Sequence, residues 1–189
     1  MVRTARVSKE DIVAAAIELV RAQGHECLNV RALASVVGCS TQPILYHFAT
    51  MDEVRSATYQ AVDELHSAYL MAGLESASDP LMRIGLNYVR FAHDEPCLFR
   101  FLFQTNAFFG QDLRSLVEAP ETGELVTVVA QSAGLEESQA RRVFLTIFVA
   151  AHGYASLLAN NAMAYDEDLV ERTLLAAYQG ALEMEGGTP

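Results

Sequence analysis

The chain has 189 residues, of which 51% are hydrophobic and 20% are charged, and its net charge is −11. This composition indicates a globular protein with a sizeable core. No apolar run approaches the roughly 18 residues of a membrane span, and the N-terminus lacks the apolar segment of a signal peptide. Three widely spaced cysteines without a C-x-x-C pair disfavour a disulfide framework or a zinc site. We therefore expect a cytoplasmic protein without membrane, metal or cofactor.

The charge is unevenly distributed along the chain. Residues 1–50 carry five basic and four acidic side chains, whereas residues 51–189 carry eight basic and twenty acidic ones. Acidity that is confined to one part of a chain is compatible with nucleic-acid binding by the other part. This contrast predicts a domain of residues 1–50 followed by a domain of residues 51–189.

The first predicted helix has clear signals at both ends. Ser8 and Asp11 form a capping-box-like start, and Gly24 is suited to end the helix in a left-handed conformation. Between these ends, apolar residues recur at the helical period and predict one buried stripe, formed by Ile12, Ala16, Leu19 and Val20.

Two short helices follow, joined by Gly38-Cys39-Ser40. Asn29 is expected to cap the first of them and Ser40 the second, which has Pro43 in its first turn. The second of these two helices is the third helix of the chain. Its inner face is predicted to consist of Ile44, Leu45 and Phe48. Helices of this length around a glycine turn predict a helix-turn-helix. A plain corner between two helices remains the alternative.

The outward face of this third helix carries hydrogen-bonding groups: Thr41, Gln42, Tyr46 and His47. Glutamine can bond adenine through two hydrogen bonds, and threonine offers a hydroxyl and a methyl group. Tyr46 and His47 can donate to phosphates. The pattern predicts a DNA-reading helix, against the alternative of an ordinary solvated face.

Beyond residue 50, six helices are predicted at 51–76, 80–94, 96–104, 111–132, 137–162 and 166–185. The last two are expected to pair with their copies in a four-helix dimer interface. Small residues at 150–159 would face an apolar stripe of Leu169, Val170, Leu174, Ala177 and Leu182. An intrachain helix pair is the alternative.

The middle of the second domain is rich in aromatic residues, which can line an apolar cavity or simply form core. There is no H-E-x-x-H, G-x-S-x-G or phosphate-binding glycine loop, so no enzyme is predicted. Cys27 and Cys39 flank the helix-turn-helix and suggest a redox sensor as a minor alternative. A helical protein-interaction module is the competing function.

The segment from Ser8 to Tyr59 resembles the DNA-binding domain of the TetR family. The matching parts are Ile12 to Ala16, Asn29 to Ala34, Gly38 to Ser40, and Leu45 to Phe48. In the second domain, residues 91–100 and 149–154 resemble a TetR subgroup named for a Trp-His-Gly signature. The chain departs from the family at Met51, where a lysine is usual.

The resemblance implies an all-α homodimer of about nine helices, and a transcriptional regulator, usually a repressor that a small ligand releases from a palindromic operator. It implies that DNA is contacted by Thr41, Gln42, Tyr46 and His47, with Asn29 and Arg31 near the backbone. Arg3 and Arg6 are expected to help as arm residues. It also implies a pocket for a small apolar effector, for which the candidate residues are Tyr88, Phe101, Phe109 and His152.

Overall fold

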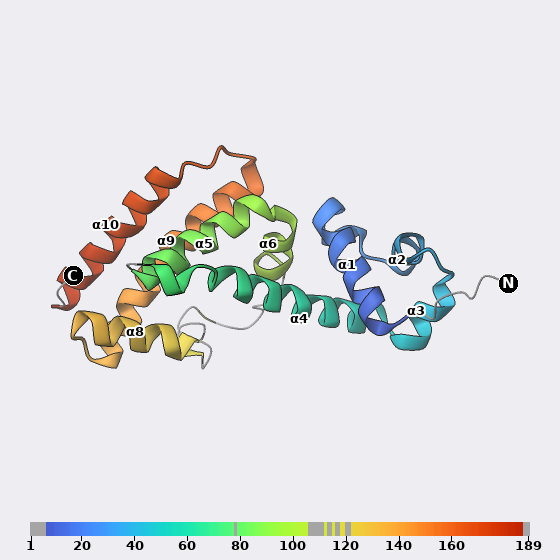
Figure 1. Cartoon of the computed structure of the whole chain (residues 1–189), viewed down its shortest axis with the longest axis horizontal. Coiled ribbons are helices and arrows are strands. Elements are labelled where there is room, and N and C mark those ends of the chain that lie inside the picture. Colours follow the sequence, from blue (N-terminus) through green and yellow to red (C-terminus); the bar gives the residue numbers. More distant parts are fainter. Residues whose placement is uncertain are drawn as a thin grey trace. The chain divides into compact units, whose positions relative to one another are not determined.

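The computed structural model describes residues 7–77, 79–105 and 122–186, together with positions 112, 115, 118 and 119. Over these residues the chain forms nine α-helices and two short 3-10 helices, and no strand (Figure 1). The prediction of an all-α fold with about nine helices is confirmed. The candidate residues Arg3, Arg6 and Phe109 lie outside the described part of the chain.

The helices follow one another as α1 (Lys9–Gln23), η1 (His25–Cys27), α2 (Val30–Val37), α3 (Thr41–His47), α4 (Met51–Leu70), η2 (Leu74–Ser76), α5 (Pro80–Asp94), α6 (Pro96–Phe103), α8 (Gly123–Ala133), α9 (Glu137–Asn161) and α10 (Glu167–Glu185). They belong to two compact units. The N-terminal unit comprises Met1–Ser67 and Glu95–Ala107, and the C-terminal unit comprises Ala68–Asp94 and Phe108–Pro189. Helix α6 is thus part of the N-terminal unit, and the chain changes units within α4 and again between α5 and α6.

The N-terminal unit is built around the apolar stripe of α1. Ile12, Ala16, Leu19 and Val20 are all buried, as predicted. Helices α2 and α6 both pack on α1. Helix α6 is also held there by an ion pair, in which Nε of Arg21 lies 3.0 and 2.8 Å from the two carboxylate oxygens of Glu95. Helices α1, α2 and α6 therefore share one core.

The predicted helix of residues 51–76 is shorter in the structure, because α4 ends at Leu70. The buried Asn87 side chain donates hydrogen bonds to the carbonyl oxygens of Leu70 and Ala72, at 2.9 and 3.0 Å. Gly73 then adopts a φ of 73°, which takes the chain out of the helix. Asn87, which lies 17 residues after Leu70, thus ends α4.

The predicted helix of residues 111–132 is interrupted in the structure. Ser115 and Glu118 are helical, Ala119 lies in a bend, and α8 begins at Gly123. A residue that precedes a proline is disfavoured in helical conformation, and residue 120 is a proline. Gly134, with a φ of 65°, ends α8 as a left-handed cap.

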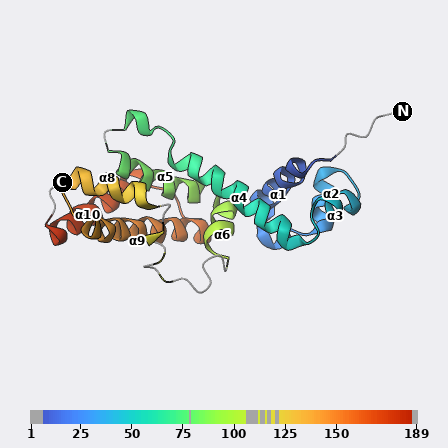
Figure 2. The same cartoon turned by 90° about the horizontal axis from the view of Figure 1, so that it is seen from below.

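The C-terminal unit has its own hydrophobic core, in which α9 takes part along its length. Its members come from α5, α8, α9 and α10, and include Leu81, Val126, Val129, Val143, Phe144, Ile147 and Leu182. Helix α5 approaches α10 closely at Gly85, where an added Cβ would lie 3.2 Å from Cδ1 of Leu174. Figure 2 shows α8, α9 and α10 running alongside one another in this unit.

Much of the predicted dimer surface is used within the chain instead. Ala151, Ala155 and Ala159 of α9 are buried, and so are Val170, Leu174 and Leu182 of α10. The reason is that α9 and α10 pack on each other and on α5, so the small residues allow close intrachain contact. By length and a mean hydropathy of 1.5 over 18 residues, α9 could also cross a membrane, but the same test is passed by core helices such as this one.

Candidate nucleic-acid interface

Helix α2 is placed by a well-formed cap and a tight turn. Oδ1 of Asn29 accepts hydrogen bonds from the backbone N–H groups of Arg31 and Ala32, at 3.1 and 3.0 Å. Nδ2 of Asn29 donates to the carbonyl of Cys27 at 3.0 Å. Gly38 ends α2 with a φ of 73°, which a residue with a side chain would adopt only at a cost. These local interactions set where α3 begins.

Helix α3 begins without the predicted side-chain cap. Ser40 occupies the N-cap position in extended conformation, but its hydroxyl makes no capping hydrogen bond. The capping hydroxyl of serine usually bonds the N–H of the third helical residue, which here is Pro43 and has no N–H. The proline that fixes the first turn therefore also removes the partner of the cap.

The two sides of α3 differ from the predicted pattern at one position. Ile44 and Phe48 are buried, as predicted, but Leu45 is 53% exposed. Residues four apart lie on one stripe of a helix, whereas neighbouring residues are turned by about 100°. Leu45 is therefore directed away from the core that Ile44 and Phe48 enter.

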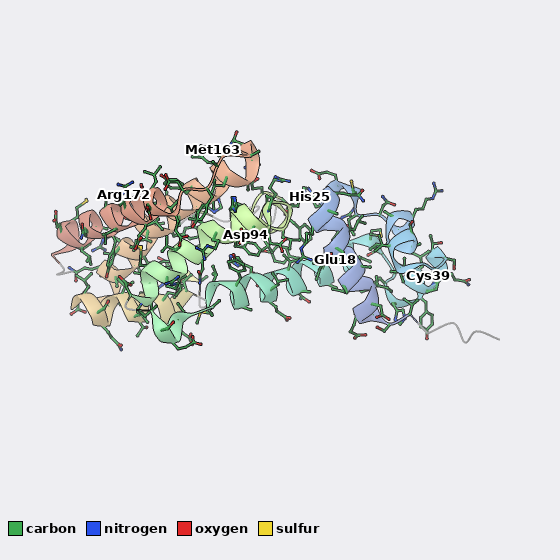
Figure 3. All side chains as sticks on the ribbon, turned by 45° about the horizontal axis from the view of Figure 1, so that its top comes forward. Glu18, His25, Cys39, Asp94, Met163 and Arg172 are labelled. Carbon is green, nitrogen blue, oxygen red and sulfur yellow. The ribbon has the colours of Figure 1, made fainter. Side chains whose placement is uncertain are left out.

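The exposed surface of the helix-turn-helix carries most of the predicted DNA-binding residues. Gln42 is exposed, Tyr46 is 74% exposed and Thr41 is half-buried, all on α3. Arg31 is exposed on α2. The side chain of Asn29 is also exposed, but its amide is already engaged in capping. Figure 3 shows the side chains of this region and labels Cys39 at the turn between α2 and α3.

His47 is half-buried and joins α3 to the chain that precedes α1. Its Nε2 lies 2.9 Å from the carbonyl oxygen of Val7. If Nε2 donates this hydrogen bond, Nδ1 of a neutral ring is an acceptor, so His47 would need a second proton to donate to a phosphate. The geometry thus gives His47 a positioning role for the segment that follows Arg3 and Arg6.

Thr50 caps the start of α4, whereas the carboxylate of Glu53 bonds the residue before the cap and does not complete a capping box. The N–H of Glu53 donates to Oγ1 of Thr50 at 3.2 Å, and Oε2 of Glu53 accepts from the N–H of Ala49 at 2.9 Å. Met51, in the first turn, is half-buried. The cation nearest in sequence on α4 is Arg55, which forms an ion pair with Asp52 at 2.8 Å.

The predicted effector residues do not all come together. In the C-terminal unit, the hydroxyl of Tyr88 on α5 lies 2.8 Å from Nδ1 of His152 on α9, and Phe148 contacts both rings. Burial raises the pKa of the Tyr88 hydroxyl and lowers the pKa of His152. Both groups are therefore neutral near pH 7, and the tautomer of His152 decides which of them donates.

Phe101 belongs to a different place, in the N-terminal unit. It is buried on α6, and its ring contacts those of His25 and Tyr59, with centroid distances of 6.3 and 6.1 Å. These three residues line a cavity of about 690 Å³, together with Asp52, Arg55, Ser56, Gln104 and Thr105. The sequence pattern did not indicate this cavity, because its walls come from three separate segments whose proximity depends on the packing of α4 and α6.

Comparison with known proteins gives the family. Residues 81–178, more than half of the chain, match the family model described as the tetracyclin repressor-like C-terminal domain. An uncharacterized HTH-type transcriptional regulator of Mycobacterium tuberculosis is 24% identical over 98% of this chain and 88% of its own length. The matched range includes residues 91–100 and 149–154, the two segments that resemble the TetR subgroup.

Solved structures with similar folds span nearly the whole chain. A transcriptional regulator from Rhodococcus sp. Rha1 has a TM-score of 0.66 at 17% identity, and covers 97% of this chain and 100% of its own. A TetR regulator from Streptomyces coelicolor has a TM-score of 0.62 at 20% identity, with the same coverage. The multidrug binding protein EbrR, solved with imidazole, has a TM-score of 0.56 at 18% identity, and covers 89% of this chain and 88% of its own. The chain belongs to the TetR family of transcriptional regulators.

Proposed function

We propose that this regulator is a homodimeric repressor, which binds a palindromic operator through α3 and is released from it by a small apolar effector. The single observation that carries the DNA-binding part is the exposed face of α3. Gln42 and Tyr46 are held outward by a helix whose opposite side, Ile44 and Phe48, is buried. A rigid helix with outward hydrogen-bonding groups is what reading of base edges in the major groove requires.

The low positive charge of α2 and α3 favours binding through base contacts over binding through attraction to phosphates. Helix α3 carries no lysine or arginine, and α2 contributes only Arg31. Phosphate contacts supply most non-specific affinity and its dependence on salt. We therefore expect weak binding to random DNA, with a shallow salt dependence, and a comparatively large gain on the correct sequence.

The outer side of α9 supports the dimer. Val149 and Leu157 are about half exposed, and Gly153 lies between them at helical spacing. Leu157 also lines a small hollow with Met163 and Leu169, two further exposed apolar residues (Figure 3 labels Met163). An apolar strip with a glycine at its centre is suited to close packing against a second helix. A two-fold axis through this strip would present two α3 helices to a palindromic site.

The cavity beside Phe101 is the effector site that we propose. Its volume is within the range of sites for small molecules. A lining that combines aromatic rings with hydrogen-bond donors and acceptors fits a planar aromatic molecule, and the net charge of the chain favours a neutral or cationic one. The Tyr88–His152 pair is the second candidate site, favoured by its neutral donor–acceptor pair in the C-terminal unit.

The position of the cavity suggests how an effector would reach the DNA-binding helices. Its walls belong to η1, which connects α1 to α2, to the first turns of α4, and to α6. Helix α6 is in turn fixed to α1 by Arg21 and Glu95. A ligand that fits only one spacing of these elements would shift the population away from the DNA-bound form.

Selection of bound sequences from a random duplex pool tests the DNA-binding function. We expect an enriched inverted repeat, with half-sites about one helical turn apart or slightly more. Enrichment without dyad symmetry would contradict the dimeric reading. Absence of any enrichment, together with no salt-dependent affinity for random DNA, would favour a helical protein-interaction module instead.

Titration with ethidium in the absence of DNA tests the effector site. Phe101→Ala should weaken binding of this planar aromatic cation, whereas Tyr88→Phe, which keeps the ring and removes only the hydroxyl, should leave it unchanged. The opposite result would move the site to the C-terminal unit. Equal binding by all three proteins would remove both sites.

A further inference from the structure

Leu45 is an apolar side chain on the face of α3 where its neighbours are polar. It is 53% exposed, and helical spacing places it between Thr41 and Gln42 on the same side of the helix. Full burial of a leucine in the core is favourable. Leu45 is only partly buried, whereas the preceding residue, Ile44, is fully buried. Leu45 belongs neither to the core of its own unit nor to the set of hydrogen-bonding residues predicted to read DNA.

Helical spacing places Leu45 in the middle of that set. Thr41 and Gln42 precede it by four and three residues, which puts all three on one side of the helix. Tyr46 follows directly and lies four residues after Gln42. When Gln42 reaches a base edge, the side chain of Leu45 therefore enters the same groove.

The major groove offers a leucine only one apolar partner. Guanine, cytosine and adenine present only donors and acceptors there, whereas thymine also presents its C5 methyl group. A leucine side chain over a polar base edge would remove water from it without replacing the hydrogen bonds, which costs free energy. Over a thymine methyl, in contrast, both apolar groups leave water.

We infer that Leu45 is a specificity-determining residue that packs on the methyl group of a thymine in each operator half-site. The inference rests on the proposed DNA-binding function. Three residues of helix rise about 4.5 Å, and base pairs are stacked about 3.4 Å apart. The thymine therefore lies within about one or two base pairs of the base that Gln42 contacts.

The test replaces thymine by uracil, which removes only the methyl group. Each thymine of the enriched operator is changed to uracil in turn, in both half-sites, and affinity is measured for the unmutated protein and for Leu45→Ala. The unmutated protein should lose roughly fourfold per half-site at one thymine, the factor expected for one buried methyl group. Leu45→Ala should bind the thymine operator more weakly and show no change on uracil at that position.

Met71→Ala is the matched control, since Met71 is an apolar residue of similar exposure, 55%, outside the helix-turn-helix. It should respond to uracil as the unmutated protein does. Circular dichroism should show an unchanged fold for Leu45→Ala, because Leu45 is not part of the buried core. Leu45→Met, which retains an apolar contact, should keep part of the uracil effect.

Three results would overturn the inference. If every uracil is tolerated while Gln42→Ala still shifts base preference, α3 reads DNA without a leucine–thymine contact. If Leu45→Ala retains the full uracil effect, another residue contacts the methyl group. If no duplex is enriched at all, the proposed function fails and this inference with it.

Discussion

The outward face of α3 and the outer side of α9 are both exposed and both carry apolar residues, but their surroundings differ. On α3, Leu45 lies between Thr41 and Gln42, so apolar and hydrogen-bonding groups share one face. On α9, Val149 and Leu157 flank the exposed Gly153, each four residues from it. A mixed face is suited to base edges, whereas an apolar strip with a central glycine is suited to a second helix. Exposed apolar residues on these two helices thus indicate two different partners.

The largest expected effect comes from filling the strip on α9. An added Cβ at Gly153 would meet nothing within 4 Å, so Gly153→Leu should leave the fold of the chain intact. It should nevertheless separate the dimer, and it should weaken operator binding by orders of magnitude because one α3 alone contacts a single half-site. Sedimentation at micromolar concentration measures the first effect and operator titration the second.

Gly153→Ala serves as the control for this substitution. A methyl group should be accommodated between the two helices, and alanine favours helix over glycine by about 1 kcal/mol. This variant should therefore remain dimeric and unfold at slightly higher denaturant concentration. If Gly153→Leu remains dimeric, the dimer interface lies elsewhere and does not include the outer side of α9.

The second prediction concerns His66, a buried residue of α4 whose ring packs edge-on against Phe103. Burial lowers its pKa to about 4. The unfolded chain therefore binds a proton near pH 6.5 that the folded chain does not bind, and stability falls as pH decreases from about 6.5 to about 4. The loss is of order 3 kcal/mol at most, from the size of this shift.

His66→Leu isolates this effect from other titrating groups. The free energy of unfolding of the unmutated protein, relative to His66→Leu, should be constant above pH 7 and should decrease as pH falls below 6.5. Denaturant titrations over this range measure the difference. A difference that does not depend on pH would mean that the His66 ring is accessible to water and protons in the folded protein.

The third prediction concerns the ion pair that holds α6 on α1. Glu95→Gln removes the charge that pairs with Arg21, whose guanidinium is only partly exposed. Hydrogen bonds to charged groups contribute about 1.5–3 kcal/mol, and the remaining amide can keep only part of this. We expect a loss toward the lower end of this range, measured by chemical denaturation, together with a changed response of DNA binding to effector. Unchanged stability would show that α6 does not depend on this pair for its position.

The fourth and smallest effect compares two caps in the same motif. Asn29→Ala should cost about 1 kcal/mol, because the side chain accepts two helix N–H groups. Ser40→Ala should change stability by less than about 0.5 kcal/mol, because the hydroxyl makes no capping bond. Equal losses in the two variants would show that Ser40 does cap α3 in solution, through another N–H group than that of Pro43.

How far the sequence could predict the structure depends on the range of the interactions involved. Ser8, Asn29 and Gly38 act on residues within a few positions of themselves, and each was predicted in its role. Ser40 does not act as predicted, because the third residue of α3 is Pro43, which has no N–H for the serine hydroxyl to bond. The end of α4 also could not be predicted, since it depends on the amide of Asn87, a residue of another helix.

The candidate sites, too, could be predicted where they depend on local periodicity and could not where they depend on tertiary packing. The outward residues Gln42 and Tyr46 followed from helical periodicity, and so did the buried Ile44 and Phe48. The assignment of Leu45 to the core was wrong because Leu45 is turned by about 100° from its neighbour Ile44, so the two residues do not lie on one stripe. The cavity of His25, Tyr59 and Phe101 depends on tertiary packing, which no spacing within the sequence indicates.

Repetition of the sequence selection with Gln42→Ala tests most directly whether α3 reads the operator. The account predicts that this variant still enriches an inverted repeat of the same spacing, since dimerisation and the outer contacts are untouched. Preference should be lost at one position in each half-site, with a cost of roughly 1–3 kcal/mol for the original base pair. An enriched sequence identical to that of the unmutated protein would contradict the assignment of α3 as the reading helix.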